Sequence, residues 1–323
     1  MEFPEEEIRN SLIAANFGRA CQLAKEWLEA APLELRNTRQ HKIAEESYVY
    51  GRFFFHRQER INQTPGSADK ARLYLKFLDE LIEIRKEREL SETIENSIWP
   101  DVYKMIHMHV AEGFARAFAG QKSYNLDQTE VIQLAVSLIE INNWPGAKES
   151  LLFMYKMNPK NALYNFLLSH VYYQLGEMDL FLTHLREALF IKPEVIEEYE
   201  KYLPEGAFQK IWDHLSGEDF SKIARYRYFA LYLEINGSYK IKREISDKEL
   251  EKTEEDFEKL YLQFKDSKNK PFLEDLKPRV LHLLAWLMYY AEEKKKLDSL
   301  ERYSSIMKKI DQDVYANFLE SNK

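Results

Sequence analysis

The amino-acid sequence predicts an all-α protein, an α-solenoid of antiparallel helix pairs that ends in a degenerate helical C-terminal cap. Two observations carry this prediction. Glycine and proline are scarce, with 10 of each in 323 residues, and a turn-rich β fold would need more of both. Apolar helical patterns also recur with a period, because Pro159 and Pro193 lie 34 residues apart and each closes such a pattern.

Composition agrees with a folded helical chain. Hydrophobic residues make up 45 % of the sequence and charged residues 31 %, which is typical of amphipathic helices with one solvated face and not of a disordered chain. The formal net charge of −8 disfavours a general nucleic-acid binder and excludes DNA as the expected partner.

The two best-matching units are residues 128–161 and 162–195. Superposing them aligns apolar or aromatic residues at equivalent places: Leu134 with Leu168, Leu138 with Tyr172, Ile139 with Tyr173, Leu151 with Leu185, and Met157 with Ile191. The pair Asn142-Asn143 falls on Gly176-Glu177. Each unit is therefore expected to form a helix, a short turn and a second helix.

These units resemble the tetratricopeptide repeat, a helix–turn–helix unit of the same length. The resemblance is carried by Leu134, Ala135, Ala147 and Pro159 in one unit, and by Leu168, Ser169, Tyr172, Gly176, Ala188 and Pro193 in the other. It implies a right-handed superhelix of stacked repeats. Departures are Val131 and Asn165, where the family prefers an aromatic residue, and Phe181 and Met154, where it prefers a small one.

The rest of the chain follows this frame less closely. Residues 1–34 are expected to form one unit, and a second unit opens near Ala44 with a long helix over 68–88. Beyond residue 195 the register is lost, but breaks still divide the chain into helix-sized pieces. We expect a long exposed helix within 240–270 and a final hairpin of 276–291 and 295–318. The predicted division is a repeat region over 1–195 and a cap over 196–323.

The resemblance implies a concave groove lined by the first helix of each repeat. Residues carried onto that groove are mainly aromatic or apolar, with one arginine and one histidine: Tyr48, Arg52, Phe55, Ile132, Val136, Ile139, Phe166, His170 and Tyr173. The Lys and Asn residues of the family's carboxylate clamp are absent, which argues against capture of chaperone C-termini. Aromatic and arginine side chains are common hot spots of protein interfaces.

No pattern of an enzyme or of a cofactor site occurs. There is no HExxH, no EF-hand loop, no GxSxG and no glycine-rich phosphate loop, and Cys21 is the only cysteine. His107 and His109 would diverge on one helix and could not chelate one ion. We therefore expect no catalytic residue, no metal and no cofactor.

The expected function is a non-enzymatic scaffold or adaptor that binds a peptide or helix of another protein in the groove. One alternative is a subunit of a homo-oligomer whose groove is self-occupied. A second, disfavoured alternative is RNA binding through the basic residues of 36–60, where glutamates dilute the positive charge. An acidic start and the lack of a long apolar run predict no membrane insertion and a cytoplasmic protein.

Overall fold

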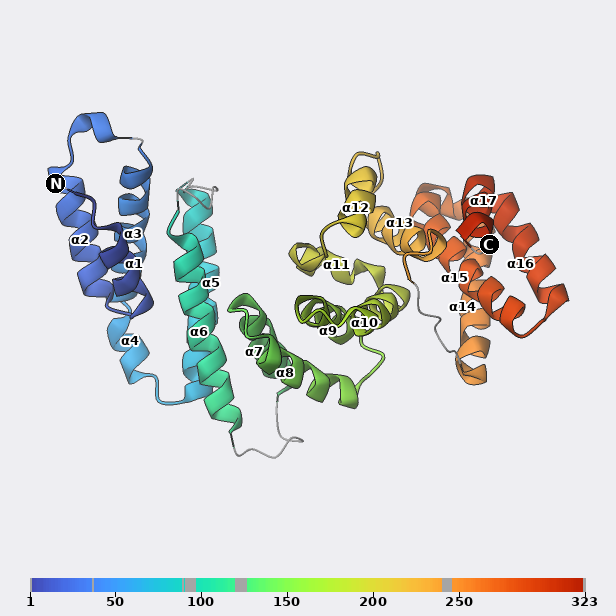
Figure 1. Ribbon diagram of the computed structural model, residues 1–323, viewed down its shortest axis with the longest axis horizontal. Helices are drawn as coiled ribbons and strands as arrows, with labels where there is room; N and C mark the ends of the chain where they lie inside the picture. Colours follow the sequence, from blue (N-terminus) through green and yellow to red (C-terminus); the bar gives the residue numbers. More distant parts are fainter. Residues whose placement is uncertain are drawn as a thin grey trace. The chain divides into compact units, whose positions relative to one another are not determined.

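The computed structural model describes residues 2–36, 38–88, 90, 97–119, 127–239 and 246–321, and all regular structure in these ranges is helical (Figure 1). The chain forms two compact units, Met1–Met154 and Tyr155–Lys323. The boundary between these two units lies inside one helix. None of the described helices is both long and apolar enough to cross a membrane.

The first unit is built from α1 (Glu5–Ile13), α2 (Phe17–Ala30), η1 (Leu33–Leu35), α3 (Arg39–Phe55), α4 (Gln58–Gln63), α5 (Ser67–Glu87), α6 (Trp99–Phe118), α7 (Gln128–Glu140) and most of α8 (Trp144–Met157). Neighbouring helices pack in pairs, and α2 with α3 and α5 with α6 are the most extensive pairs of this unit. The predicted long helix over 68–88 is thereby confirmed as α5.

The second unit contains α9 (Ala162–Gln174), α10 (Met178–Ile191), η4 (Pro193–Val195), α11 (Ile196–Tyr199), η5 (Glu200–Tyr202), α12 (Ala207–Ser216), α13 (Lys222–Ile235), α14 (Asp247–Lys265), η6 (Ser267–Phe272), α15 (Leu273–Glu293), α16 (Leu297–Ile310) and α17 (Gln312–Ser321). Here α9 packs on α10, and α15 is central because it contacts α13, α14 and α16.

Four helix hairpins have turns with the same backbone geometry. At Ala15, Asn142, Gly176 and Lys295 the backbone is left-handed, with φ of 56°, 61°, 74° and 55°. In each turn the N–H of the next residue bonds back to a carbonyl five residues earlier, as in Asn143 to Leu138 (2.8 Å) and Glu177 to Tyr172 (2.9 Å). This arrangement satisfies the free carbonyls at a helix end. The predicted equivalence of Asn142-Asn143 with Gly176-Glu177 is confirmed.

Two glycines allow helices to approach closely. A Cβ built on Gly51 of α3 would lie 3.0 Å from the backbone nitrogen of Cys21 in α2. A Cβ on Gly113 of α6 would lie 2.7 Å from the carbonyl oxygen of Ser67 in α5. The most extensive helix pairs of the first unit therefore each depend on a residue without a side chain.

The entrance to α6 is held by a buried carboxylate. Glu46, 1 % exposed, accepts hydrogen bonds from the Ser97 hydroxyl (2.5 Å) and the Ile98 backbone N–H (2.9 Å). Pro100 stands in the first turn of the helix, where a proline costs no backbone hydrogen bond.

In the second unit, Asn165 stands where the tetratricopeptide repeat prefers an aromatic residue, and its buried side chain forms a hydrogen-bond network. Its side-chain N–H group donates to the carbonyls of Pro159 (2.8 Å) and Asn161 (2.9 Å). Its oxygen is thereby left to accept from Nδ1–H of His184 in α10 at 2.8 Å. The network joins the two helices of the hairpin α9–α10.

Two expectations for the C-terminal region need correction. The helix predicted within 240–270 is α14, and its Leu250, Thr253 and Phe257 are buried against the unit, so it is not exposed throughout; residues 240–245 lie outside the described ranges. The predicted helix over 295–318 is divided into α16 and α17 at Asp311. The carboxylate of Asp311 accepts from the N–H groups of Asp313 and Val314, and so caps the start of α17.

Candidate interaction surface

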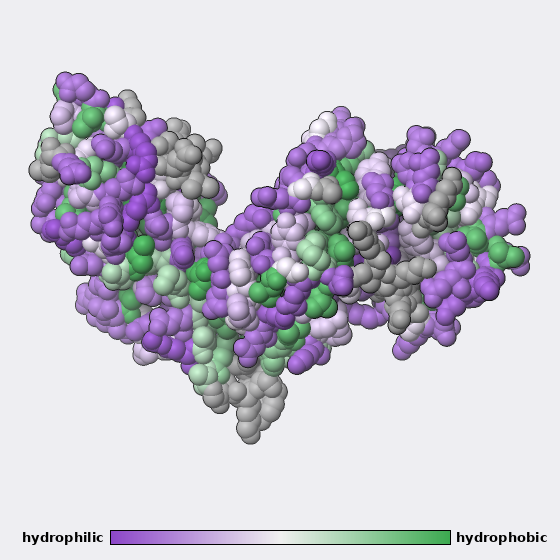
Figure 2. Space-filling view, viewed as in Figure 1, coloured by the Kyte–Doolittle hydropathy of each residue, from purple (hydrophilic) through white to green (hydrophobic). Residues whose placement is uncertain are grey.

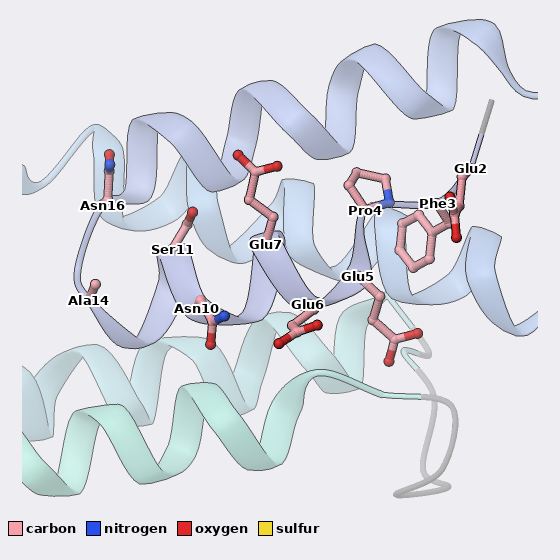
Figure 3. A pocket seen from close by; sticks show the side chains of 10 residues that line it. All are labelled: Glu2, Phe3, Pro4, Glu5, Glu6, Glu7, Asn10, Ser11, Ala14 and Asn16. Atoms are coloured by element: carbon pink, nitrogen blue, oxygen red, sulfur yellow. The ribbon is translucent and has the colours of Figure 1, made fainter.

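One hollow in the surface of the first unit is lined by several acidic side chains. This hollow of about 730 Å³ lies along α1 and is lined by Glu2, Glu5, Glu6 and Glu7 among others. Figure 3 shows Glu7 on one side of α1 and Glu5 and Glu6 on the other. Arginines neutralise two of these carboxylates, since Arg19 donates to Glu7 at 2.7 Å and Arg39 to Glu5 at 2.7 Å. No group of three metal-ligating side chains occurs among the described residues.

The predicted groove residues of α9 are covered by the chain itself. Phe166 is 1 % exposed and His170 9 %. Nδ1 of His170 lies 3.0 Å from the carbonyl oxygen of Tyr202, and the two rings lie 4.7 Å apart. Tyr202 thus occupies the place where an open groove was expected beside His170. Tyr173 is half-buried and packs its ring 5.3 Å from that of Phe181.

The predicted groove residues of α7 are partly accessible. Ile132 and Val136 are half-buried, whereas Ile139 is 2 % exposed and belongs to the core of the first unit. Ile139 therefore differs from the expectation, because its side chain is buried and does not line an open groove.

The predicted residues of α3 form an accessible stripe, which we call the α3 face: Tyr48, Arg52 and Phe55. The spacing i, i+4, i+7 places the three on one side of the helix. Phe55 is 56 % exposed, Arg52 is exposed and Tyr48 is half-buried. Figure 2 shows hydrophobic residues in several places among the hydrophilic ones on the displayed face, and Leu33, Leu262 and Leu297 are also more than half exposed.

The α3 face continues onto α2. A Cβ on Gly18 would lie 3.3 Å from the ring of Phe55, and Cys21 lies against Gly51 in the neighbouring turn. The Phe55 ring therefore rests on α2 on one side and is open to solvent on the other.

Two arginines at the two ends of α3 are paired with carboxylates. Arg39 pairs with Glu5 at 2.7 Å, and Arg57 pairs with Glu80 at 3.0 Å while lying 3.7 Å above the Phe53 ring. Arg52 differs, because its Nε donates to Nε2 of His56 at 3.3 Å and no described carboxylate pairs with it. The exposed Glu45 and Glu59 interrupt the basic residues of 36–60, among which Arg36, Lys42 and Arg60 are also exposed.

A buried charged cluster in the second unit was missed by sequence reasoning. Glu234 of α13, 2 % exposed, binds Arg186 of α10 through two hydrogen bonds, of which the Nε–Oε2 bond measures 3.1 Å. His282 of α15 lies 4.0 Å from the same carboxylate and accepts from the Trp286 indole N–H at 3.2 Å. The three charged or titratable groups come from residues far apart in sequence, so no local motif marks them.

The environment sets the protonation of this cluster. Burial works to raise the pKa of Glu234, but the adjacent His282 and Arg186 outweigh it, so the pKa lies below its ordinary value. Burial lowers the pKa of His282 although Glu234 opposes this. The cluster thus contains a carboxylate, a guanidinium and a neutral imidazole, and it joins three helices.

The histidine pair diverges as predicted. His107 is buried and its Nδ1 lies 3.0 Å from the Ser137 hydroxyl, whereas His109 stacks on Tyr74 with ring centroids 4.5 Å apart. The two imidazoles of this pair have different neighbours and share no ligand position.

Comparison with known proteins identifies no relative. No protein-family model, no curated protein and no solved structure matches the chain.

Proposed function

We propose that the chain is a non-enzymatic scaffold or adaptor that binds another protein through the α3 face. The observation that supports this proposal best is the exposure of Phe55 and Arg52 side by side on a helix whose Tyr50, Phe53 and Phe54 are buried. Exposed aromatic and arginine side chains of this kind supply much of the binding energy in protein interfaces.

The proposal retains the architecture inferred from the repeat resemblance. The helix pairs with a common turn are stacked as a tetratricopeptide-like, right-handed solenoid, and the protein acts in the cytoplasm. The four equivalent turns support the stacking of similar hairpins. Phe166 and His170 are buried within the chain. We therefore place partner binding at Tyr48, Arg52 and Phe55 instead.

An affinity capture from the native cell lysate tests the proposal. The baits are the intact chain, the Arg52→Ala/Phe55→Ala double variant and a Met108→Ala control, in which an exposed residue of the same unit is truncated. We expect a protein that the intact chain and the control retain and that the double variant loses. Equal capture by all three baits would contradict binding at the α3 face.

Self-association is the competing outcome. Light scattering over a dilution series measures it, and a dimer that the double variant abolishes would assign the α3 face to a second copy of this chain. A monomer at every concentration agrees with the proposal.

A further inference from the structure

The charge pattern of α3 points to the chemistry of the partner. Of the arginines on this helix, Arg39 is bound to Glu5, whereas Arg52 has no carboxylate among the described residues. Because its Nε is directed to His56, the two terminal nitrogens of Arg52 are left for a ligand. An arginine in this state matches a carboxylate, which binds two parallel N–H groups.

Resting on the proposed function, we infer that the α3 face binds an acidic amphipathic segment of another protein. A carboxylate of that segment pairs with Arg52, and an apolar side chain covers the exposed side of the Phe55 ring. Arg52 and Phe55 stand three residues apart on one helix and are therefore surface neighbours. The partner must place its acidic and apolar side chains within one helical turn of each other.

The surroundings favour a protein segment over RNA. Glu45 lies one turn before Tyr48 on α3 and is exposed, and Glu59 follows on α4. A phosphate backbone tracking along α3 would meet both carboxylates, and because Arg57 is already paired with Glu80, only Lys42 and Arg60 would offset them. A peptide with a single carboxylate at Arg52 avoids this repulsion.

Selection from a phage-displayed library of random short peptides tests the inference, with the full-length chain as bait. Parallel selections use Arg52→Glu and, as a matched control, Arg116→Glu, which reverses an exposed arginine of α6 in the same unit. Circular dichroism and thermal melting verify that each variant is folded.

The expected result is that the wild type and Arg116→Glu enrich peptides with Asp or Glu within one turn of an aromatic or leucine residue. Arg52→Glu should instead enrich Lys or Arg at that place. Peptides that bind only with an intact Phe55 but show no acidic preference would overturn the inference and leave the proposed function standing.

Two further outcomes contradict the inference in distinguishable ways. If no enriched peptide loses affinity for Phe55→Ala or Arg52→Glu, both the inference and the proposed function fail. If random-sequence single-stranded RNA binds the wild type at physiological salt and Arg52→Glu abolishes that binding, the partner is RNA and not an acidic protein.

Discussion

At the scale of single residues, the buried carboxylate of Glu234 is the group on which the contact of three helices depends. Arg186, which it binds, is 9 % exposed and also lies 4.3 Å above the Trp286 ring. Removing the negative charge would take the Glu234 carboxylate away from this buried guanidinium, which is far more costly than losing an exposed ion pair.

We expect Glu234→Gln to lower the free energy of unfolding by about 3–5 kcal/mol. The control Glu255→Gln removes a carboxylate from an exposed pair with Lys259 and should cost about 1 kcal/mol or less. Urea denaturation of both variants measures the difference. Equal, small effects would show that Glu234 does not hold the three helices together.

The buried imidazole of His184 makes stability depend on pH. Burial lowers its pKa from 6.5 to about 4. The unfolded chain therefore binds a proton between these values while the folded chain does not, so stability present above pH 6.5 is lost as the pH falls toward 4. The shift corresponds to about 3 kcal/mol.

His184→Gln tests this directly, because an amide N–H can still donate to Asn165 but cannot titrate. Chemical denaturation at a series of pH values should give a flatter decline for the variant than for the wild type between pH 6.5 and 4. Parallel curves would refute the assignment to His184.

Two phenylalanines predicted for the same groove should differ in how much stability the protein loses when each is truncated to alanine. Phe166→Ala should cost about 3–5 kcal/mol, since it empties a buried site. Phe55→Ala should stay within about 0.5 kcal/mol because the ring is exposed. Thermal or urea unfolding measures both, and a large loss in Phe55→Ala would mean that its ring is a packing residue instead of a binding one.

At the scale of secondary-structure elements, the helix pairs and the turns that join them are the best-predicted features. The turns at Asn142 and Gly176 follow from their repeat spacing and from turn-forming residue types. The left-handed backbone at Ala15 and Lys295 could not be predicted from the residue types, although the final hairpin placed a break before residue 295.

The close approach of α5 and α6 gives a prediction at this scale. Gly113→Ala should destabilise the first unit by about 1–3 kcal/mol, because the clash with the Ser67 carbonyl exceeds the gain of about 1 kcal/mol in helix propensity. The control Gly146→Ala meets only the Asn143 side chain. Urea denaturation compares them, and a stabilised Gly113→Ala would contradict the close packing.

At the scale of the whole molecule, composition and period were sufficient to predict an all-helical chain, but not which faces remain open. His170 is covered through a tertiary contact with Tyr202 that no local pattern encodes. The cluster of Arg186, Glu234 and His282 was missed for the same reason. Phe55 and Arg52 could be named from the repeat position, whereas their exposure required the structure.

The native cysteine provides the most direct test of the central claim, that a partner docks on the α3 face. Cys21 is the only cysteine of the chain, is partly exposed, and lies on α2 against Gly51 beside the stripe. The measurement is the rate of maleimide modification of Cys21, followed by mass spectrometry, in the free chain and in the captured complex. The account predicts markedly slower modification in the complex, and an unchanged rate would contradict docking on this face.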